Sequence, residues 1–251
     1  MNVRGRLRIA MWSGPRNIST AMMRAWENRE DTAVIDEPFY AHYLNETGVQ
    51  HPGRDDVLAS QSTDPAEVAA MLAGPIPGGK RIWYQKHMTQ HMLPGMPLDW
   101  LAEVSNCFLI RDPERVAASF TIQRPDAAPW ELGFEQQARL FDYVCDRLGH
   151  APPVIDAADV LKEPRTALVT LCEVLDIPFA ERMLHWPPGP RESDGVWAPH
   201  WYAAVERSTG FAPYRPRKGD LTPFQQKLAD ACRPHYERLA RHRLMGADTA
   251  T

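Results

Sequence analysis

The chain has little cysteine, no long apolar run and little excess charge. Its 251 residues include four cysteines, 32 acidic residues and 28 basic residues, for a net charge of −4. A charge this small gives no bulk attraction to nucleic acid or to an anionic membrane, so we expect neither as a partner. No apolar run approaches the roughly 18 residues of a membrane span, and no apolar signal-peptide core follows the basic residues 1–8. We therefore expect a cytoplasmic protein.

The few cysteines also lack the spacing of a metal site. They stand at positions Cys107, Cys145, Cys172 and Cys232, far apart in the chain. This excludes paired C-x-x-C ligands and the dense disulfide framework of a small secreted domain. The first three lie in apolar patterns typical of buried strands or helices. We expect free thiols, a reducing compartment and no metal.

The lysine of a nucleotide triphosphatase loop is missing as well. The stretch from Ile9 to Ala21 has the pattern of an apolar strand, a glycine turn and a helix start. Such a turn binds anions, because free backbone N–H groups and the positive end of the helix dipole meet there. Aligned on Gly14, the motif G-x-x-x-x-G-K-[ST] has Ser19, Thr20 and Ala21 in place of its last three defined residues. The pattern predicts a metal-free oxyanion cradle at Ser13, Gly14, Arg16, Asn17, Ser19 and Thr20; an ordinary capped turn is the alternative.

A second segment, residues 106–119, repeats the strand-to-helix pattern. Arg111 ends a short apolar strand, and Asp112 and Pro113 have the types of an N-cap and a first helical residue. Ser119 follows Arg111 by about two helical turns, so a ligand lying across the helix could contact both. A structural salt bridge is the alternative role for Arg111.

Together the two segments resemble the sulfotransferase family, which uses 3′-phosphoadenosine 5′-phosphosulfate (PAPS). The resemblance covers about residues 8–176 and implies that the first loop, at Gly14, Arg16, Asn17, Ser19 and Thr20, holds the 5′-phosphosulfate. It implies that Arg111 and Ser119 take the 3′-phosphate. Arg217, Lys218 and Gly219 are similar to a further 3′-phosphate element of cytosolic members, although a solvated basic turn is the alternative. Residues 197–211 resemble a bacterial sulfotransferase-like subgroup, and there Ser208 is another candidate contact with the nucleotide.

Strand and helix patterns alternate along the chain. Strands are expected at residues 8–12, 33–35, 82–85, 107–110 and 153–156, with helices at about 18–26, 65–72, 131–148 and 163–175. This order predicts a P-loop-like three-layer α/β fold, in which a parallel sheet of about five strands is covered by helices on both faces. We expect a single domain over residues 1–251, with residues 186–221 as an irregular cap over the cleft and 222–245 as a C-terminal helix.

Candidate catalytic residues follow the second and third predicted strands. Glu37 would stand at the ligand rim of the sheet, where its carboxylate could take the proton of an acceptor; an ion pair with Arg16 or Arg111 is the alternative. Cytosolic sulfotransferases carry a Lys-x-His near the third strand, whereas Lys86 and His87 are adjacent here. Neighbours on a strand point to opposite sides, so Lys86 and His87 are not expected to reach the same substrate. Lys86 is the expected charge stabiliser, and either His87 or His91 is the alternative base.

The leading interpretation is a PAPS-dependent sulfotransferase that acts on a hydroxyl or amine of a small molecule. The tryptophans of the predicted cap favour an apolar or aromatic acceptor. One alternative is a kinase or nucleotide hydrolase with a degenerate phosphate loop, which would need Mg²⁺ ligands that the motifs lack. Another is a nucleotide-binding module without catalysis.

Overall fold

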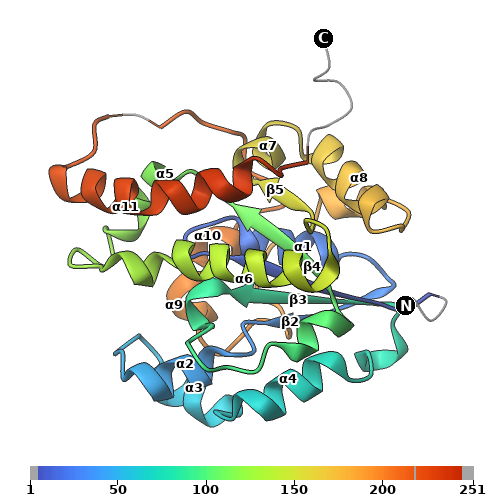
Figure 1. Cartoon of the computed structure of the whole chain (residues 1–251). Helices are drawn as coiled ribbons and strands as arrows, with labels where there is room; N and C mark the ends of the chain where they lie inside the picture. Colours follow the sequence, from blue (N-terminus) through green and yellow to red (C-terminus); the bar gives the residue numbers. More distant parts are fainter. Residues whose placement is uncertain (1–4, 218, 245–251) are drawn as a thin grey trace.

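A five-stranded parallel sheet forms the centre of the molecule in a computed structural model that describes residues 5–217 and 219–244 (Figure 1). The strand order is β2-β3-β1-β4-β5, and every neighbouring pair is parallel. The predicted three-layer α/β fold is therefore confirmed. The strands are β1 Leu7–Ser13, β2 Thr32–Asp36, β3 Ile82–Met88, β4 Ser105–Ile110 and β5 Val154–Asp156.

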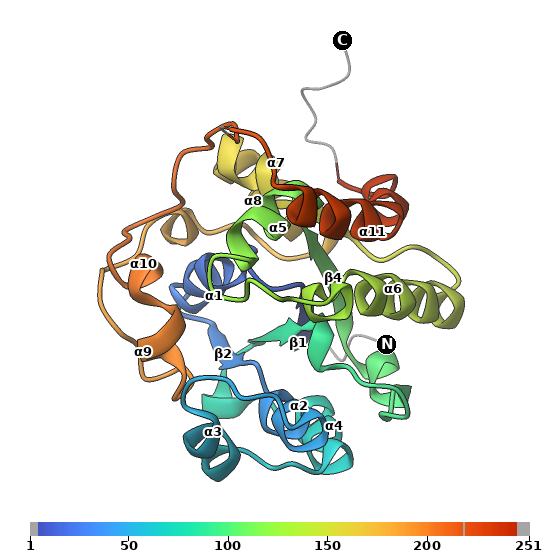
Figure 2. The same cartoon turned by 90° about the vertical axis from the view of Figure 1, so that its left-hand side faces the viewer.

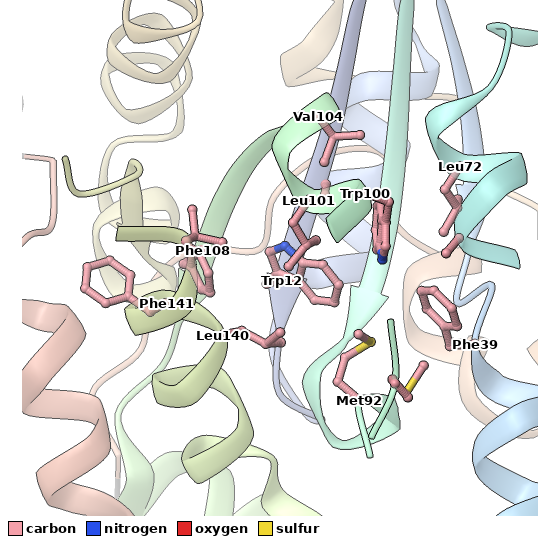
Figure 3. Packing of buried hydrophobic residues seen from close by; sticks show 14 of the residues in the cluster. Trp12, Phe39, Leu72, Met92, Trp100, Leu101, Val104, Phe108, Leu140 and Phe141 are labelled. Atoms are coloured by element: carbon pink, nitrogen blue, oxygen red, sulfur yellow. The ribbon is translucent and has the colours of Figure 1, made fainter. Parts of the chain in front are cut away.

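Helices cover both faces of this sheet, with α6 and α11 on one side and α1 on the other (Figures 1 and 2). A hydrophobic core fills the space between the sheet and the helices on each face. Side chains alternate in direction along β1, so Trp12 packs in one core and Met11 in the other. Figure 3 shows the layer around Trp12, where Phe108 meets Phe141 of α6. The covering helices are α1 Ser19–Glu27, α4 Pro65–Ala73, α6 Phe134–Leu148, α7 Ala157–Lys162, α8 Pro164–Val174 and α11 Pro223–Ala240.

Helix starts follow the predicted capping residues. Asp112 caps α5, Pro113–Phe120, by accepting hydrogen bonds from the backbone N–H groups of Glu114 and Arg115. Thr222 and Gln225 form a reciprocal capping box at the start of α11. This last helix ends at Ala240 instead of residue 245, and it continues through Pro234.

The region between β2 and β3 contains more helix than the sequence pattern predicts. Besides α4 it holds α2, Tyr40–Thr47, and α3, Arg54–Ser60. Both are short and flanked by turn residues, which hid them from a search for helical periodicity. They pack on each other, and α2 brings the rings of Tyr40 and Tyr43 to the carboxyl end of β2.

The first part of the segment 186–217 lies beside α1 and the end of β2 (Figure 2), and its later part reaches α7, where the backbone N–H of Tyr214 donates to the carbonyl of Leu161. The segment contains the short helices α9, Ala198–Trp201, and α10, Ala203–Glu206. A buried ion pair of 2.7 Å joins Asp194 of this segment to Arg24 of α1. Throughout the described ranges, no helix has the length and apolar character needed to cross a membrane.

Candidate functional site

A cavity of about 440 Å³ opens at the carboxyl ends of the strands. The β1–α1 loop forms one end of it, and the residues that follow β2 and β3 form the other. The segment 197–212 lines the cavity between these ends. Of the predicted site residues, the lining contains Arg16, Asn17, Ser19, Thr20, Glu37, Lys86, His91, Arg111, Ser119 and Ser208.

The β1–α1 loop leaves backbone donors free at this cavity. Helix α1 begins at Ser19, and its N-cap Ile18 makes no side-chain capping bond. The first N–H groups of the helix therefore lack a side-chain acceptor. Arg16 has φ of +54°, a left-handed conformation that is unusual for a residue with a side chain. Free amides and a strained turn at a helix start are typical of an anion site.

Three predicted phosphate ligands from two separate motifs meet at this loop. Nε of Arg16 donates a hydrogen bond of 2.9 Å to Oγ of Ser119, and the Arg111 guanidinium donates to the backbone carbonyl of Arg16. Burial lowers the pKa of Arg111, and the neighbouring cations Arg115 and Arg16 lower it further. This crowding of positive charge favours a bound anion.

Not all of the predicted cradle faces the cavity. Ser13 is buried with its hydroxyl 3.5 Å from the carbonyl of His87, and neither Ser13 nor Gly14 is part of the lining. Asn17 lines the cavity, but its amide donates to the carbonyl of Leu109 at 3.0 Å, and its Oδ1 accepts from the next backbone N–H. Asn17 thus holds the loop against the end of β4.

The predicted basic element near residue 217 lies apart from the cavity. Arg217 forms an ion pair of 3.3 Å with Glu114, and neither it nor Gly219 lines the cavity. Lys218 is outside the described residues. Ser208 does line the cavity, with its hydroxyl donating to Val205 and accepting from the indole of Trp186.

At the other end, the Lys86 ammonium lies in a buried cluster of polar groups. Its Nζ is 2.7 Å from Oδ1 of Asp36, 2.5 Å from Oε1 of Glu37 and 2.7 Å from the hydroxyl of Tyr202. Burial alone would lower the pKa of Lys86, but the carboxylates of Asp36 and Glu37 outweigh it and hold this pKa well above its usual value. Lys86 is therefore a permanent cation at the cavity wall.

Glu37 combines a strained backbone with a buried carboxylate. Its φ is +40°, and its backbone N–H donates to the carbonyl of Lys86. Burial raises the pKa of the Glu37 carboxyl, although the nearby Lys86 ammonium acts against this rise. Oε1 accepts from Lys86, whereas Oε2 lies 3.9 Å from Nε2 of His91. One oxygen is thus held by the cation and the other is available at the cavity.

The two histidines differ in position. His91 lines the cavity between the rings of Tyr40 and Tyr43, and burial lowers its pKa well below the usual value. His87 is instead in the hydrophobic core, stacked on Trp12 at 4.2 Å and packed near Trp100. The expectation that His87 could act in catalysis is corrected by this placement, because β3 stays regular and turns adjacent side chains to opposite faces.

Several residues of the cavity and of the buried cluster beside it were not found from the sequence pattern. Asp36 and Tyr202 complete the cluster around Lys86, and the rings of Tyr40, Tyr43 and Trp197 surround it. The acidic pair that ends β2 was a usable signal for Asp36. Nothing in the local pattern places Tyr202, which comes to the cluster from 116 positions further along the chain than Lys86.

Comparison with known proteins identifies the family. Residues 7–242 match the model of the sulfotransferase domain family, and the chain belongs to this family. Two proteins of Arabidopsis thaliana are similar to it: branched-chain-amino-acid aminotransferase-like protein 1, 37% identical over 237 residues, and protein 2, 34% identical over 235 residues. Each match covers 93% of this chain but only 42% and 41% of the respective relative, so the chain spans about two fifths of their length.

Solved structures share the fold. A sulfotransferase domain from the curacin biosynthetic pathway has a TM-score of 0.52 at 17% identity, covering 90% of this chain and 98% of that one. A sulfotransferase from Alicyclobacillus acidocaldarius has a TM-score of 0.53 at 12% identity, covering 96% and 97%. At these identities the likeness concerns the fold alone.

Proposed function

We propose that this chain transfers a sulfuryl group from PAPS to a hydroxyl or amine of a small molecule. The observation that carries the proposal is the meeting of Arg16, Arg111 and Ser119 at one end of the cavity, with Glu37 and Lys86 at the other. The family supports a sulfotransferase reaction, and the two arginines beside the start of α1 suit a nucleotide with phosphate groups at two positions.

The nucleotide end would hold the two phosphate positions of the donor. The free amides of the α1 start and the hydroxyls of Ser19 and Thr20 suit the 5′-phosphosulfate, and Arg111 with Ser119 suits the 3′-phosphate. Arg16 stands between them and would exchange its bond to Ser119 for a phosphate oxygen. No metal is part of this proposal.

The other end supplies the groups that transfer needs. The acceptor oxygen or nitrogen forms a bond to sulfur while the bond from sulfur to the 5′-phosphate oxygen breaks, and the acceptor proton goes to a base. We assign the base to Oε2 of Glu37, because Lys86 holds the other oxygen. Lys86 supplies positive charge for the oxygen that leaves. The surrounding rings of Tyr40, Tyr43 and Trp197 suit a flat apolar or aromatic acceptor.

Calorimetry with 3′-phosphoadenosine 5′-phosphate (PAP) and a metal chelator tests the nucleotide end. We expect binding to the wild-type protein, and a loss of about 10- to 100-fold in affinity for Arg111→Ala, because charge-assisted hydrogen bonds to phosphate disappear. The matched control is Arg139→Ala, which removes an exposed arginine of α6 outside the cavity and should leave affinity unchanged.

Release of PAP from PAPS in the presence of phenolic and amine acceptors tests the reaction itself. Equal PAP affinity for Arg111→Ala and wild type would contradict the placement of the nucleotide. Tighter binding of ATP with Mg²⁺ than of PAP would favour the kinase alternative, and tight PAP binding without transfer to any acceptor would favour a binding module.

A further inference from the structure

The hydroxyl of Tyr202 occupies the centre of the buried cluster. It lies 2.7 Å from Nζ of Lys86, 2.7 Å from Oδ2 of Asp36 and 3.1 Å from Nε1 of Trp197. A phenol hydroxyl has one proton to donate and two lone pairs to accept with. Lys86 and Trp197 can only donate, so the single Tyr202 proton is shared between the two carboxylates, with Oδ2 of Asp36 at 2.7 Å as the main acceptor and Oε1 of Glu37 at 3.4 Å as the second.

The Lys86 ammonium is saturated. It has three N–H donors, and they point to Asp36, Glu37 and Tyr202. Its orientation is therefore fixed by three partners, of which only Tyr202 is uncharged. Lys86 binds Oε1 of Glu37, and this bond decides which carboxylate oxygen is left for the cavity.

We propose that Tyr202 is a positioning residue of the transfer reaction, an inference that rests on the proposed function. With Asp36 it holds the Lys86 ammonium against Oε1 of Glu37, so that Oε2 remains free for the acceptor proton. Because Tyr202 is the neutral partner, its bond to Lys86 is also the one that Lys86 can exchange for the leaving oxygen while both carboxylate bonds persist.

The surrounding segment is built to keep Tyr202 in place. The backbone N–H of Gly195 donates to Oδ2 of Asp36 at 3.2 Å, so two points of this segment bind the same carboxylate. A Cβ at Gly195 would lie 2.1 Å from the indole ring of Trp197, so only glycine leaves room for that ring. The cavity wall between the Lys86 cluster and the nucleotide end contains Tyr202, Val205 and Ser208. These residues are spaced three apart, so they lie on one side of the segment.

The titration of Glu37 reports on this arrangement. The charged or titratable groups that face Glu37 are Asp36 on β2, Tyr40 on α2, Lys86 on β3, His91 beyond β3 and Tyr202. Lys86 and the Tyr202 hydroxyl both lower the pKa of Glu37, opposing the effect of burial. Removing the hydroxyl therefore raises this pKa, and the loss of activity on acidification begins at a higher pH.

The experiment compares Tyr202→Phe with wild type, and Tyr214→Phe is its matched control. Tyr214 lies in the same segment but packs its ring against Arg115 and Lys162 outside the cavity. For Tyr202→Phe we expect kcat to fall about 10- to 100-fold, because a bond to a charged group is lost, with KM for PAPS unchanged. The acidic midpoint of the kcat profile moves to higher pH. Tyr214→Phe changes none of these.

A second readout needs no turnover. In protein with ¹⁵N-labelled lysine, the chemical shift of the buried Lys86 ammonium follows the protonation of Glu37. The Lys86 signal is assigned by its loss in Lys86→Arg. Its acidic midpoint should move upward in Tyr202→Phe. An unchanged midpoint overturns the proposal, even where kcat falls.

If wild type releases no PAP from PAPS, the proposed function fails, whereas this titration still decides the effect of Tyr202. If Tyr202→Phe does not fold, the double variant Tyr202→Phe/Trp197→Phe replaces it. The second change removes the indole N–H of Trp197, which would otherwise lose its acceptor, the Tyr202 hydroxyl.

Discussion

Glu37 is the residue on which the proposed chemistry depends most. Asp36 and Glu37 are adjacent, yet both carboxylates reach Nζ of Lys86. In a regular strand they would point to opposite faces. The positive φ of Glu37 ends the strand geometry and turns its side chain to the same cation. Strain at this position thus brings two carboxylates to one lysine.

The raised pKa of Glu37 predicts how the reaction depends on pH. Only the ionised carboxylate can accept a proton, and burial raises the pKa above its ordinary value of 4.5. Activity should therefore fall with decreasing pH, with a midpoint above that of an exposed glutamate. A kcat profile measures this midpoint. An acidic limb at or below 4.5 would contradict the role of Glu37.

Glu37→Gln tests the same residue directly. We expect the rate of transfer to fall about 10²- to 10⁴-fold, as for loss of a general base, while PAP affinity is unchanged. Glu135→Gln, on the exposed face of α6, is the control and should keep full activity. Retained transfer in Glu37→Gln would leave His91 as the remaining cavity imidazole for the role.

At the scale of elements, the β1–α1 loop depends on contact with the turn before α6. A Cβ built at Gly14 would lie 2.7 Å from the backbone carbonyl oxygen of Leu132. Leu132 ends a short 3₁₀ helix, Pro129–Leu132, so the backbone of one element touches that of another. Gly14 is needed for this close approach, although it does not line the cavity.

Gly14→Ala should therefore act through packing. We expect a loss of about 1–3 kcal/mol in the free energy of unfolding, because one backbone segment must move. PAP affinity should fall with it, since the loop carries Arg16 and the α1 start. Urea denaturation and calorimetry measure the two effects. Wild-type stability in Gly14→Ala would show that the loop has room to adjust.

The sequence pattern predicted elements better than it predicted the groups that converge on the cavity. Arg111 and Ser119 could be found because a strand end and a capped helix are local signals. Lys86 and Glu37 could be found because strand ends share one edge of a parallel sheet. Tyr202 and Asp36 could not be paired, since their contact depends on the path of residues 186–221, which have little periodicity.

At the scale of the whole molecule, a buried ion pair joins the segment that contains Tyr202 to helix α1. Arg24 and Asp194 have side chains that are 1% and 4% exposed, and Arg24 also lies 3.5 Å from Glu27. Removing one partner leaves a buried charge without full compensation. The pair therefore matters more to stability than an exposed pair of similar length.

Asp194→Asn should lower the free energy of unfolding by about 3 kcal/mol and slow transfer, because the segment loses an anchor near Tyr202. The control is Glu181→Gln, which breaks the exposed ion pair with Arg165 and should have little measurable effect. Thermal unfolding and PAP release compare the two variants. Equal stability of both would show that Arg24 does not anchor this segment.

The central claim is that two motifs, separated in sequence, form one nucleotide site at the carboxyl ends of the strands. A crystal structure of the protein with PAP tests it most directly. The account predicts the 3′-phosphate within hydrogen-bond distance of Arg111 and Ser119, and the 5′-phosphate at the start of α1. A nucleotide bound elsewhere, or with its 3′-phosphate away from both side chains, would contradict it.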